Sequence, residues 1–259
     1  MTPQPSRRVW QIMLGLGAAI APIIPVLFPE HKVLAVLVSP LLYWVFRTLY
    51  DNVPGFSVTV RRLWLCLTNA RVNWSLSVDY TVTANQTTLP RVIQALVDGY
   101  PGTKTMESTD SFAFLQLPDL GIVRVSSRQV PEYDSTITSH LLIDFQEIAA
   151  PFRHADGLVE QISQLMEDHL ESAVDASARR FTCKVRFGQS NPYYGLYIQR
   201  LAVPKQDAVR YHIEFEDSIG TRRERIHVSE RQLSFVTDNL MSWSRLARRY
   251  ITLAEVPAA

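Results

Sequence analysis

Residues 72–83 read VNWSLSVDYTVT, and they alternate strictly between apolar and polar side chains. A period of two places all the apolar side chains on one face of a β-strand and leaves the other face in water. The preceding stretch, residues 56–67, is rich in Val, Leu and Trp, and we expect it to be a strand that pairs with residues 72–83 across a short turn. A strand with one wet face predicts an antiparallel sheet whose other face is covered.

Further strands and helices follow along the chain. Residues 88–99 place Leu89, Val92 and Leu96 on one helical face and end on Gly99, and residues 158–174 show a second helical stripe. The sequence predicts an α+β fold, a mostly antiparallel sheet domain covered by about three helices. The other expected strands are residues 111–117, 120–126, 137–145, 181–187, 194–201, 209–216 and 222–228.

The last two of these strands are expected to form a hairpin. If residues 217–220 (DSIG) are the turn, Glu214 faces Arg223 and Tyr211 faces Ile226. The charge run at residues 222–225 is then the solvated face of the hairpin.

The C-terminal helix is expected to begin at residue 229, because Ser229 and Gln232 fit a capping box. Its apolar side chains follow at spacings of three and four residues and form a narrow stripe, which is typical of a seam against one surface. That surface is either the domain's own sheet or a second copy of the chain. The candidates for self-association are Leu233, Val236, Leu240 and Trp243.

The N-terminal part of the chain is strongly apolar. Residues 9–28 carry no charge, and at 1.5 Å per residue they span about 30 Å, the thickness of the hydrocarbon core of a bilayer. Residues 33–46 are a second uncharged run, and residues 29–32 (PEHK) form a short polar turn between the two. We expect residues 1–50 to form a transmembrane helical hairpin. Close packing of its helices is expected at Gly15, Gly17, Ala18 and Ala19.

Two other interpretations of the first run remain open. Arg7 and Arg8 before it and an Ala-Ile-Ala sequence at residues 19–21 resemble a signal peptide, although the run is long for one and Pro22 would follow the cleavage point. The two runs could also be helices buried in a soluble core.

The flanking charges predict the orientation of the hairpin. Arg7 and Arg8 precede it and Arg47 ends it, whereas the turn contains only Lys32, beside Glu30. The positive-inside bias places both termini and the domain of residues 51–259 in the cytoplasm. We therefore expect a protein of the bacterial inner membrane, with free thiols at its two cysteines.

The net charge of +1 conceals an uneven distribution. Residues 51–178 contain 8 basic and 16 acidic residues, whereas residues 179–259 contain 14 basic and 8 acidic ones. Opposite charge on neighbouring regions favours association between subdomains, with a boundary near residues 176–180, or between copies. The basic C-terminal end also suits an anionic ligand, or it complements a helix dipole.

The ligand candidates lie in this basic end and in one loop. Arg245, Arg248 and Arg249 suit lipid headgroups, nucleic acid or a phosphorylated ligand. Tyr193 and Tyr194, in the loop of residues 188–195, suit stacking on a base or a small ligand, although a hairpin connection needs no such role.

The sequence contains no phosphate-binding glycine loop, metal motif or nucleophile elbow. His140 and Asp144 are near enough on one strand face to share a hydrogen bond, or they are simply part of a polar face. Cys66 and Cys183 lie between apolar neighbours and are expected in the core. We expect no catalytic residue, metal or cofactor.

In its layout, two spanning helices before a cytoplasmic α+β domain, the chain resembles the two-transmembrane effectors of bacterial antiviral systems. The resemblance implies a domain that senses a trigger and a membrane part that damages or depolarises the bilayer. We expect a non-enzymatic membrane protein whose domain binds a partner, a ligand or its own copies. The alternatives are a membrane-tethered enzyme acting on a nucleotide or nucleic acid, and a scaffold subunit of a larger membrane complex.

Overall fold

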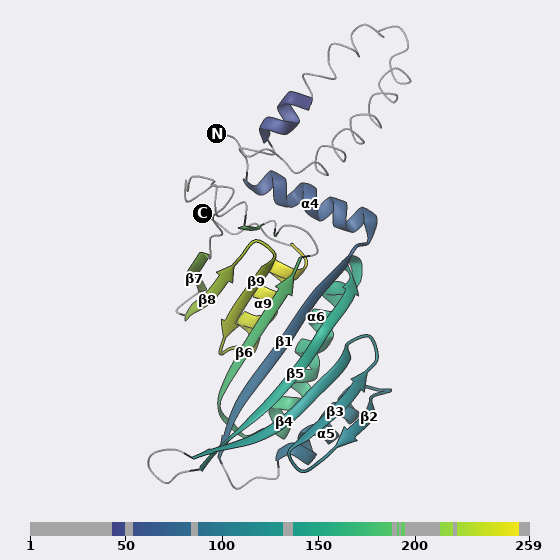
Figure 1. The fold of residues 1–259 in the computed structure, drawn as a ribbon, viewed down its shortest axis with the longest axis vertical. Helices are drawn as coiled ribbons and strands as arrows, with labels where there is room; N and C mark the ends of the chain where they lie inside the picture. Colours follow the sequence, from purple (N-terminus) through teal and green to yellow (C-terminus); the bar gives the residue numbers. More distant parts are fainter. Residues whose placement is uncertain are drawn as a thin grey trace, which may run out of the picture.

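The computed structural model describes residues 43–49, 54–83, 88–131, 137–187, 191, 193–194, 213–219 and 222–253. They form an α+β fold in which helices pack on one face of a single large antiparallel sheet (Figure 1), as the sequence predicts. The expected membrane hairpin lies outside the described residues, apart from the helical residues 43–49 at its end.

The sheet has nine strands in the order β2-β3-β4-β5-β1-β6-β9-β8-β7, and every neighbouring pair is antiparallel. The strand expected from its alternation, β1, lies in the middle, and its apolar side chains from Val72 to Val82 are all buried. The bounds are β1 Arg71–Thr83, β2 Lys104–Ser108, β3 Phe112–Leu117, β4 Gly121–Pro131, β5 Ile137–Pro151, β6 Ala176–Arg186, β7 Ile213–Ile219, β8 Arg222–Val228 and β9 Gln232–Thr237.

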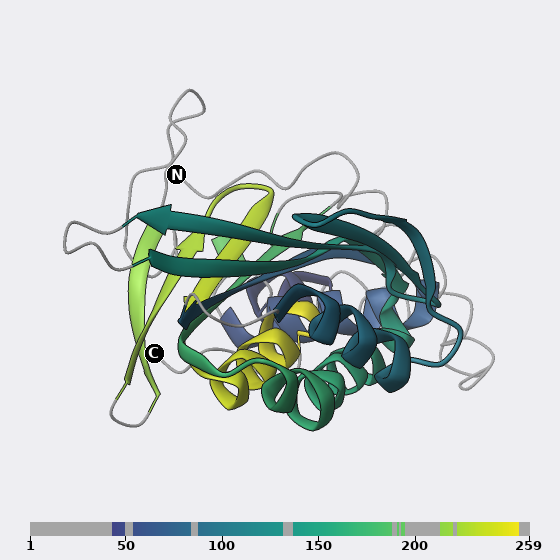
Figure 2. The same ribbon diagram turned by 90° about the horizontal axis from the view of Figure 1, so that it is seen from below.

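Three helical segments cover one face of this sheet (Figure 2). They are α5 Thr88–Gly99, α9 Leu240–Ile251, and α6 Phe152–Leu165 with its continuation through the π-helix η2 Met166–Leu170 and the short α7 Glu171–Ala173. The core lies between these helices and the sheet, where Trp243 of α9 stacks on Phe181 of β6 with 6.4 Å between ring centroids. The expected cover of about three helices is confirmed.

Residues 56–67, expected to be a strand, are instead helical. They belong to α4 Pro54–Thr68, which lies across the end of the sheet (Figure 1). Val58 and Leu65, seven residues apart and so on one helix face, pack against the core. Asn69 has a positive φ of 47° and ends the helix directly before β1. The β-branched and aromatic residues of this stretch favour a strand, but this packing outweighs that preference.

The expected C-terminal helix is correct only in its second half. Residues 232–237 form β9, and the N–H and Oγ of Ser229 both donate to the carbonyl of Gln232, so the expected capping box is a turn between β8 and β9. The helix begins after Asn239, whose side-chain oxygen accepts from the N–H groups of Met241 and Ser242.

The hairpin of β7 and β8 exists, but its expected register is wrong. Glu214 pairs with His227 and Phe215 with Ile226, so the connection falls at residues 220–221. The expected strand at residues 194–201 lies outside the described residues except for Tyr194, which is in a helical turn. The expected boundary near residues 176–180 coincides with the start of β6, which pairs with β1 on one side and β9 on the other.

Candidate functional site

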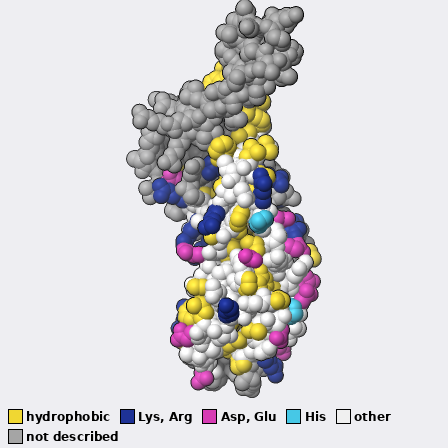
Figure 3. All heavy atoms as spheres, turned by 90° about the vertical axis from the view of Figure 1, so that its right-hand side faces the viewer, with side chains coloured by type: hydrophobic (Ala, Val, Ile, Leu, Met, Phe, Trp, Pro, Cys, Tyr) yellow, Lys and Arg dark blue, Asp and Glu magenta, His cyan; other side chains and the backbone are white. Residues whose placement is uncertain are grey.

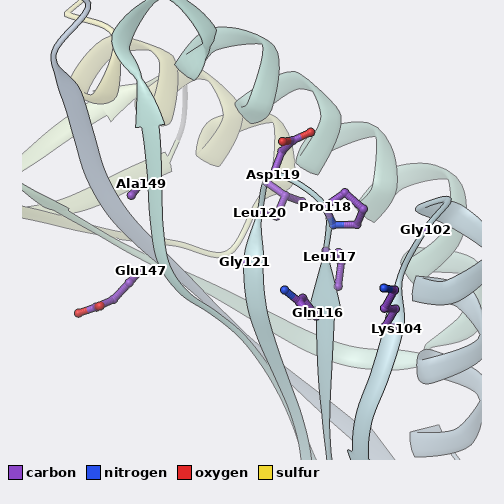
Figure 4. Close-up of a pocket in the computed structure, with 10 residues that line it drawn as sticks. All are labelled: Gly102, Lys104, Gln116, Leu117, Pro118, Asp119, Leu120, Gly121, Glu147 and Ala149. Atoms are coloured by element: carbon purple, nitrogen blue, oxygen red, sulfur yellow. The ribbon is translucent and has the colours of Figure 1, made fainter.

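A pocket of about 470 Å³ opens where β3 turns into β4. Lys104 and Gln116 come from neighbouring strands, Asp119 from the β3–β4 turn, and Glu147 from β5 (Figure 4). We call it the turn pocket.

The backbone of the turn pocket is unusual, because four of its residues have positive φ. Gly102 has 88° and Gly121 has 79°, which glycine tolerates, but Asp119 has 62° and Glu147 has 48°. At Asp119 the Leu120 N–H donates to the Pro118 carbonyl at 2.7 Å, which closes a tight γ-turn. Such strain persists where the surrounding structure enforces it, and it is concentrated at ligand sites.

At Glu147 the cause of the positive φ is a β-bulge. Trp74 of β1 pairs with Ile148 and Leu76 with Phe145, so two residues of β5 stand against one of β1. The Glu147 side chain consequently extends from the sheet, where its carboxylate accepts from Arg186 at 3.2 Å. The bulge therefore places Glu147 at the edge of the turn pocket, with its carboxylate directed away from the other lining residues (Figure 4).

The chemistry of the turn pocket suits binding. Burial, and then the nearby Asp119 carboxylate, raise the pKa of Tyr100, so this phenol stays protonated and donates to Gln161 Oε1 at 3.2 Å. Lys104 and Asp119 offer one cation and one anion beside a hollow that is open to solvent, and the Glu147 carboxylate points away from it. Such groups can hold a small polar ligand. In the described part of the chain, no three His, Cys, Asp or Glu side chains are grouped to hold a metal ion.

The face of the sheet opposite the helices is polar. His140 Nδ1 lies 3.1 Å from Asp79 Oδ1 on the neighbouring strand, so its partner is Asp79, and His140 and Asp144 belong to a polar face, one of the two interpretations of the sequence. Asp144 instead pairs across the sheet with Arg124, whose guanidinium carbon lies 5.9 Å from the Phe114 ring centroid. This face of the sheet therefore presents charge of both signs to solvent.

The five predicted ligand residues have different surroundings in the structure, and ligand binding by them stays a prediction. Arg248 forms ion pairs with Asp156 and Glu160 of α6 and so fastens α9 to α6. Tyr193 is fully buried, and its hydroxyl donates to the Arg249 carbonyl at 2.8 Å. These residues hold the fold together. Arg245 is exposed on α9 and Tyr194 is half-buried.

The predicted self-association residues lie mostly in the core. Leu233, Leu240 and Trp243 are buried within their own chain, and Val236 lies half-buried on the opposite face of β9 from Leu233. In this conformation they present no continuous seam, and association between copies stays a prediction. The predicted packing residues Gly15, Gly17, Ala18 and Ala19 lie outside the described residues.

The two cysteines differ. Cys183 is buried, as expected, and burial raises the pKa of its thiol, so it is an unreactive core residue. Cys66 is exposed on α4, and its expected place in the core is wrong.

The outer side of α4 is apolar and exposed, a surface that we did not expect because these residues were predicted to be a strand. Leu63 is 59% exposed, Trp64 38% and Leu67 74%, and we call these three residues the α4 surface. The helical segment of residues 43–49 adds exposed Trp44, Val45 and Leu49 at the same end of the molecule (Figure 3). The signal in the sequence was the spacing of Phe56, Val60, Leu63 and Leu67, which is four, three and four residues.

Comparison with known proteins gives no relative from which a role could be transferred. No protein-family model matches the chain, and no curated protein is detectably similar to it in sequence. Among the helices that the structure describes, none has both the length and the apolar character needed to cross a membrane.

Proposed function

We propose that this protein is anchored in the bacterial inner membrane by its N-terminal hairpin, and that its α+β domain is a non-enzymatic binding module that controls the hairpin. The observation that carries the proposal is the junction between the two parts. The apolar run of residues 33–46 ends at Phe46, whose ring packs edge-on against Phe56 of α4 with 5.1 Å between centroids. The domain is thus fastened at the point where the apolar run ends.

The other end of α4 is hydrogen-bonded to the core. The Ala70 N–H donates to the Leu65 carbonyl at 3.3 Å, and the Phe152 N–H donates to the Ala70 carbonyl at 2.9 Å. Arg153 Nε donates to the carbonyl of Cys66 at 2.8 Å, at the C-terminal end of α4. Because α4 is held to both β1 and α6, a shift of the domain against the membrane would move α4 and the hairpin together.

The domain offers binding surfaces for a trigger. The turn pocket is sized for a small polar ligand, and the open face of the sheet suits a partner protein or a second copy. The hairpin sequence has little polar surface with which to line a pore, so damage to the bilayer would require several copies brought together by their domains. The role proposed is that of a membrane-perturbing effector in bacterial defence, with both termini in the cytoplasm.

The test compares the full chain with a variant in which residues 1–46 are replaced by an unrelated transmembrane hairpin of the same orientation. We expect the full chain to be oligomeric in detergent and to depolarise cells on induction, and the swapped variant to be inserted but harmless. Monomers at every concentration together with an unchanged membrane potential would defeat the proposal. An activity that survives the swap would indicate a tethered enzyme, and co-purification with one fixed partner, without a phenotype, would indicate a scaffold subunit.

A further inference from the structure

We propose that α4 makes a second membrane contact and lies along the bilayer surface as an interfacial helix. The α4 surface would then lie at the boundary between headgroups and acyl chains. The inference rests on the proposed anchoring and deepens it, because it specifies how the domain is oriented on the lipid.

The two sides of α4 have different surroundings although both are apolar. Val58 is 1% exposed and faces the core, whereas Leu67, nine residues further on, is 74% exposed. At about 3.6 residues per turn, nine residues are two and a half turns, so the two side chains point in opposite directions. The helix therefore packs on the domain with one side and presents Leu63, Trp64 and Leu67 outward.

The composition of α4 suits a bilayer surface. The helix contains no acidic residue, and three exposed cations lie in it or at its C-terminal end: Arg62, Arg71 and Arg153. Figure 3 shows Lys and Arg side chains next to the apolar ones at this end of the domain. Cations beside an apolar patch fit anionic headgroups, and a Trp at this depth is typical of the membrane interface.

The position of α4 in the chain identifies the bilayer as the occupant. Phe46, the last residue of the apolar run, contacts Phe56 in the first turns of α4. If the run enters lipid, the start of α4 is within one side-chain contact of the headgroups. The spacing of Phe56, Val60, Leu63 and Leu67 then continues the same apolar surface away from the hairpin. A second copy or a partner protein on this surface would have to compete with the lipid beside it.

The experiment measures the depth of a nitroxide on α4 in the full chain, reconstituted in phosphatidylcholine–phosphatidylglycerol vesicles. Leu67→Cys is labelled in a Cys66→Ser background, where the buried Cys183 does not react. The matched control is Met241→Cys on α9, a site that is 82% exposed and lies in a different helix. Collision rates with oxygen, which concentrates in lipid, and with a water-soluble nickel chelate are measured at both sites.

We expect the ratio of oxygen to nickel collisions to be several-fold higher at residue 67 than at residue 241. Equal ratios at the two sites, in protein that floats with the vesicles, would overturn this inference and leave the anchoring intact. Shielding of residue 67 from both reagents would also overturn it, because a protein surface would then cover α4. Protein that does not float with the vesicles would overturn the anchoring and the inference with it.

Discussion

Two glycines on neighbouring helices are predicted to respond in opposite ways to the same substitution. A Cβ at Gly99, the last residue of α5, would lie 2.6 Å from His169 Cδ2 and 2.7 Å from Leu165 Cδ1. A Cβ at Gly157, inside α6, would meet no atom within 4 Å. Gly99→Ala therefore forces the α5 and α6–η2 segments apart, whereas Gly157→Ala only removes the helix penalty of glycine.

The magnitudes follow from these distances. Overpacking at Gly99 costs about 1–3 kcal/mol of unfolding free energy, because two of the three crowded atoms belong to a ring that must move as a unit. Gly157→Ala gains about 1 kcal/mol from helix propensity alone. The two variants should thus differ by about 3 kcal/mol, which corresponds to roughly 6–12 °C in Tm for a domain of this size.

The assay is thermal and urea unfolding of the full chain in detergent, followed by tryptophan fluorescence. Adding His169→Ala to Gly99→Ala supplies the missing space and should recover part of the loss, a coupling that a double-mutant cycle measures. Equal effects of the two glycine substitutions, or the absence of any coupling to His169, would refute the packing described for α5 against η2.

Four further substitutions test other parts of the fold by the same unfolding assay. Asn239→Ala should lower the free energy of unfolding by about 1 kcal/mol, because two N–H groups lose their cap, and Ser229→Ala should lower it by less. A larger loss for Ser229→Ala would indicate that the helix is capped at residue 229 instead. Tyr80→Phe should not destabilise at neutral pH, because the buried hydroxyl has no hydrogen-bond partner among the described residues. Burial, and then the Glu171 carboxylate, raise the pKa of Tyr80 above its ordinary value of 10.0. The free energy of unfolding of the wild type should therefore fall above about pH 10, by about 1.4 kcal/mol per pH unit from this group. Tyr80→Phe should remove this contribution to the pH dependence. Glu147→Gly should stabilise by about 1 kcal/mol, since glycine accepts a φ of 48° without strain, and a loss of stability would show that the bulge depends on its side chain.

The prediction of β1 was correct and that of α4 was wrong for the same physical reason. Val72 to Val82 alternate, and only one face of the resulting strand is covered, so pattern and environment agree. In α4 apolar side chains lie on both sides, Val58 against the core and Leu63 and Leu67 outward, and the inner ones mask the helical spacing of the outer ones. The local preference for a strand then dominates the expectation, while packing decides the structure.

The C-terminal segment fits two periods at once. Leu233, Val236 and Leu240 have helical spacing, but Leu233 and Phe235 also alternate with polar residues. The strand forms because β6 and β8 offer hydrogen-bonding edges on both sides of it. Which strand edges are free depends on strand order. The partners of β1 lie about 55–113 positions away in the sequence, a separation that no local pattern encodes.

Only part of the turn pocket could be predicted from the sequence. The expected strands at residues 111–117 and 120–126 leave residues 118–119 as their connection, and the structure contains a tight turn there. The bulge that directs Glu147 outward arises from a mismatch between β1 and β5. Such a mismatch depends on how two distant strands are paired, so Glu147 carried no signal of its own.

The most direct test of the proposed membrane anchoring is the topology of the hairpin turn. His31→Cys in a Cys66→Ser background places a thiol in the expected turn, and the natural Cys66 on α4 reports the domain side. With a membrane-impermeant maleimide applied to intact spheroplasts, we expect residue 31 to be labelled and Cys66 to be labelled only after permeabilisation. Labelling of both sites only after permeabilisation, together with recovery of the full chain in the soluble fraction, would contradict it.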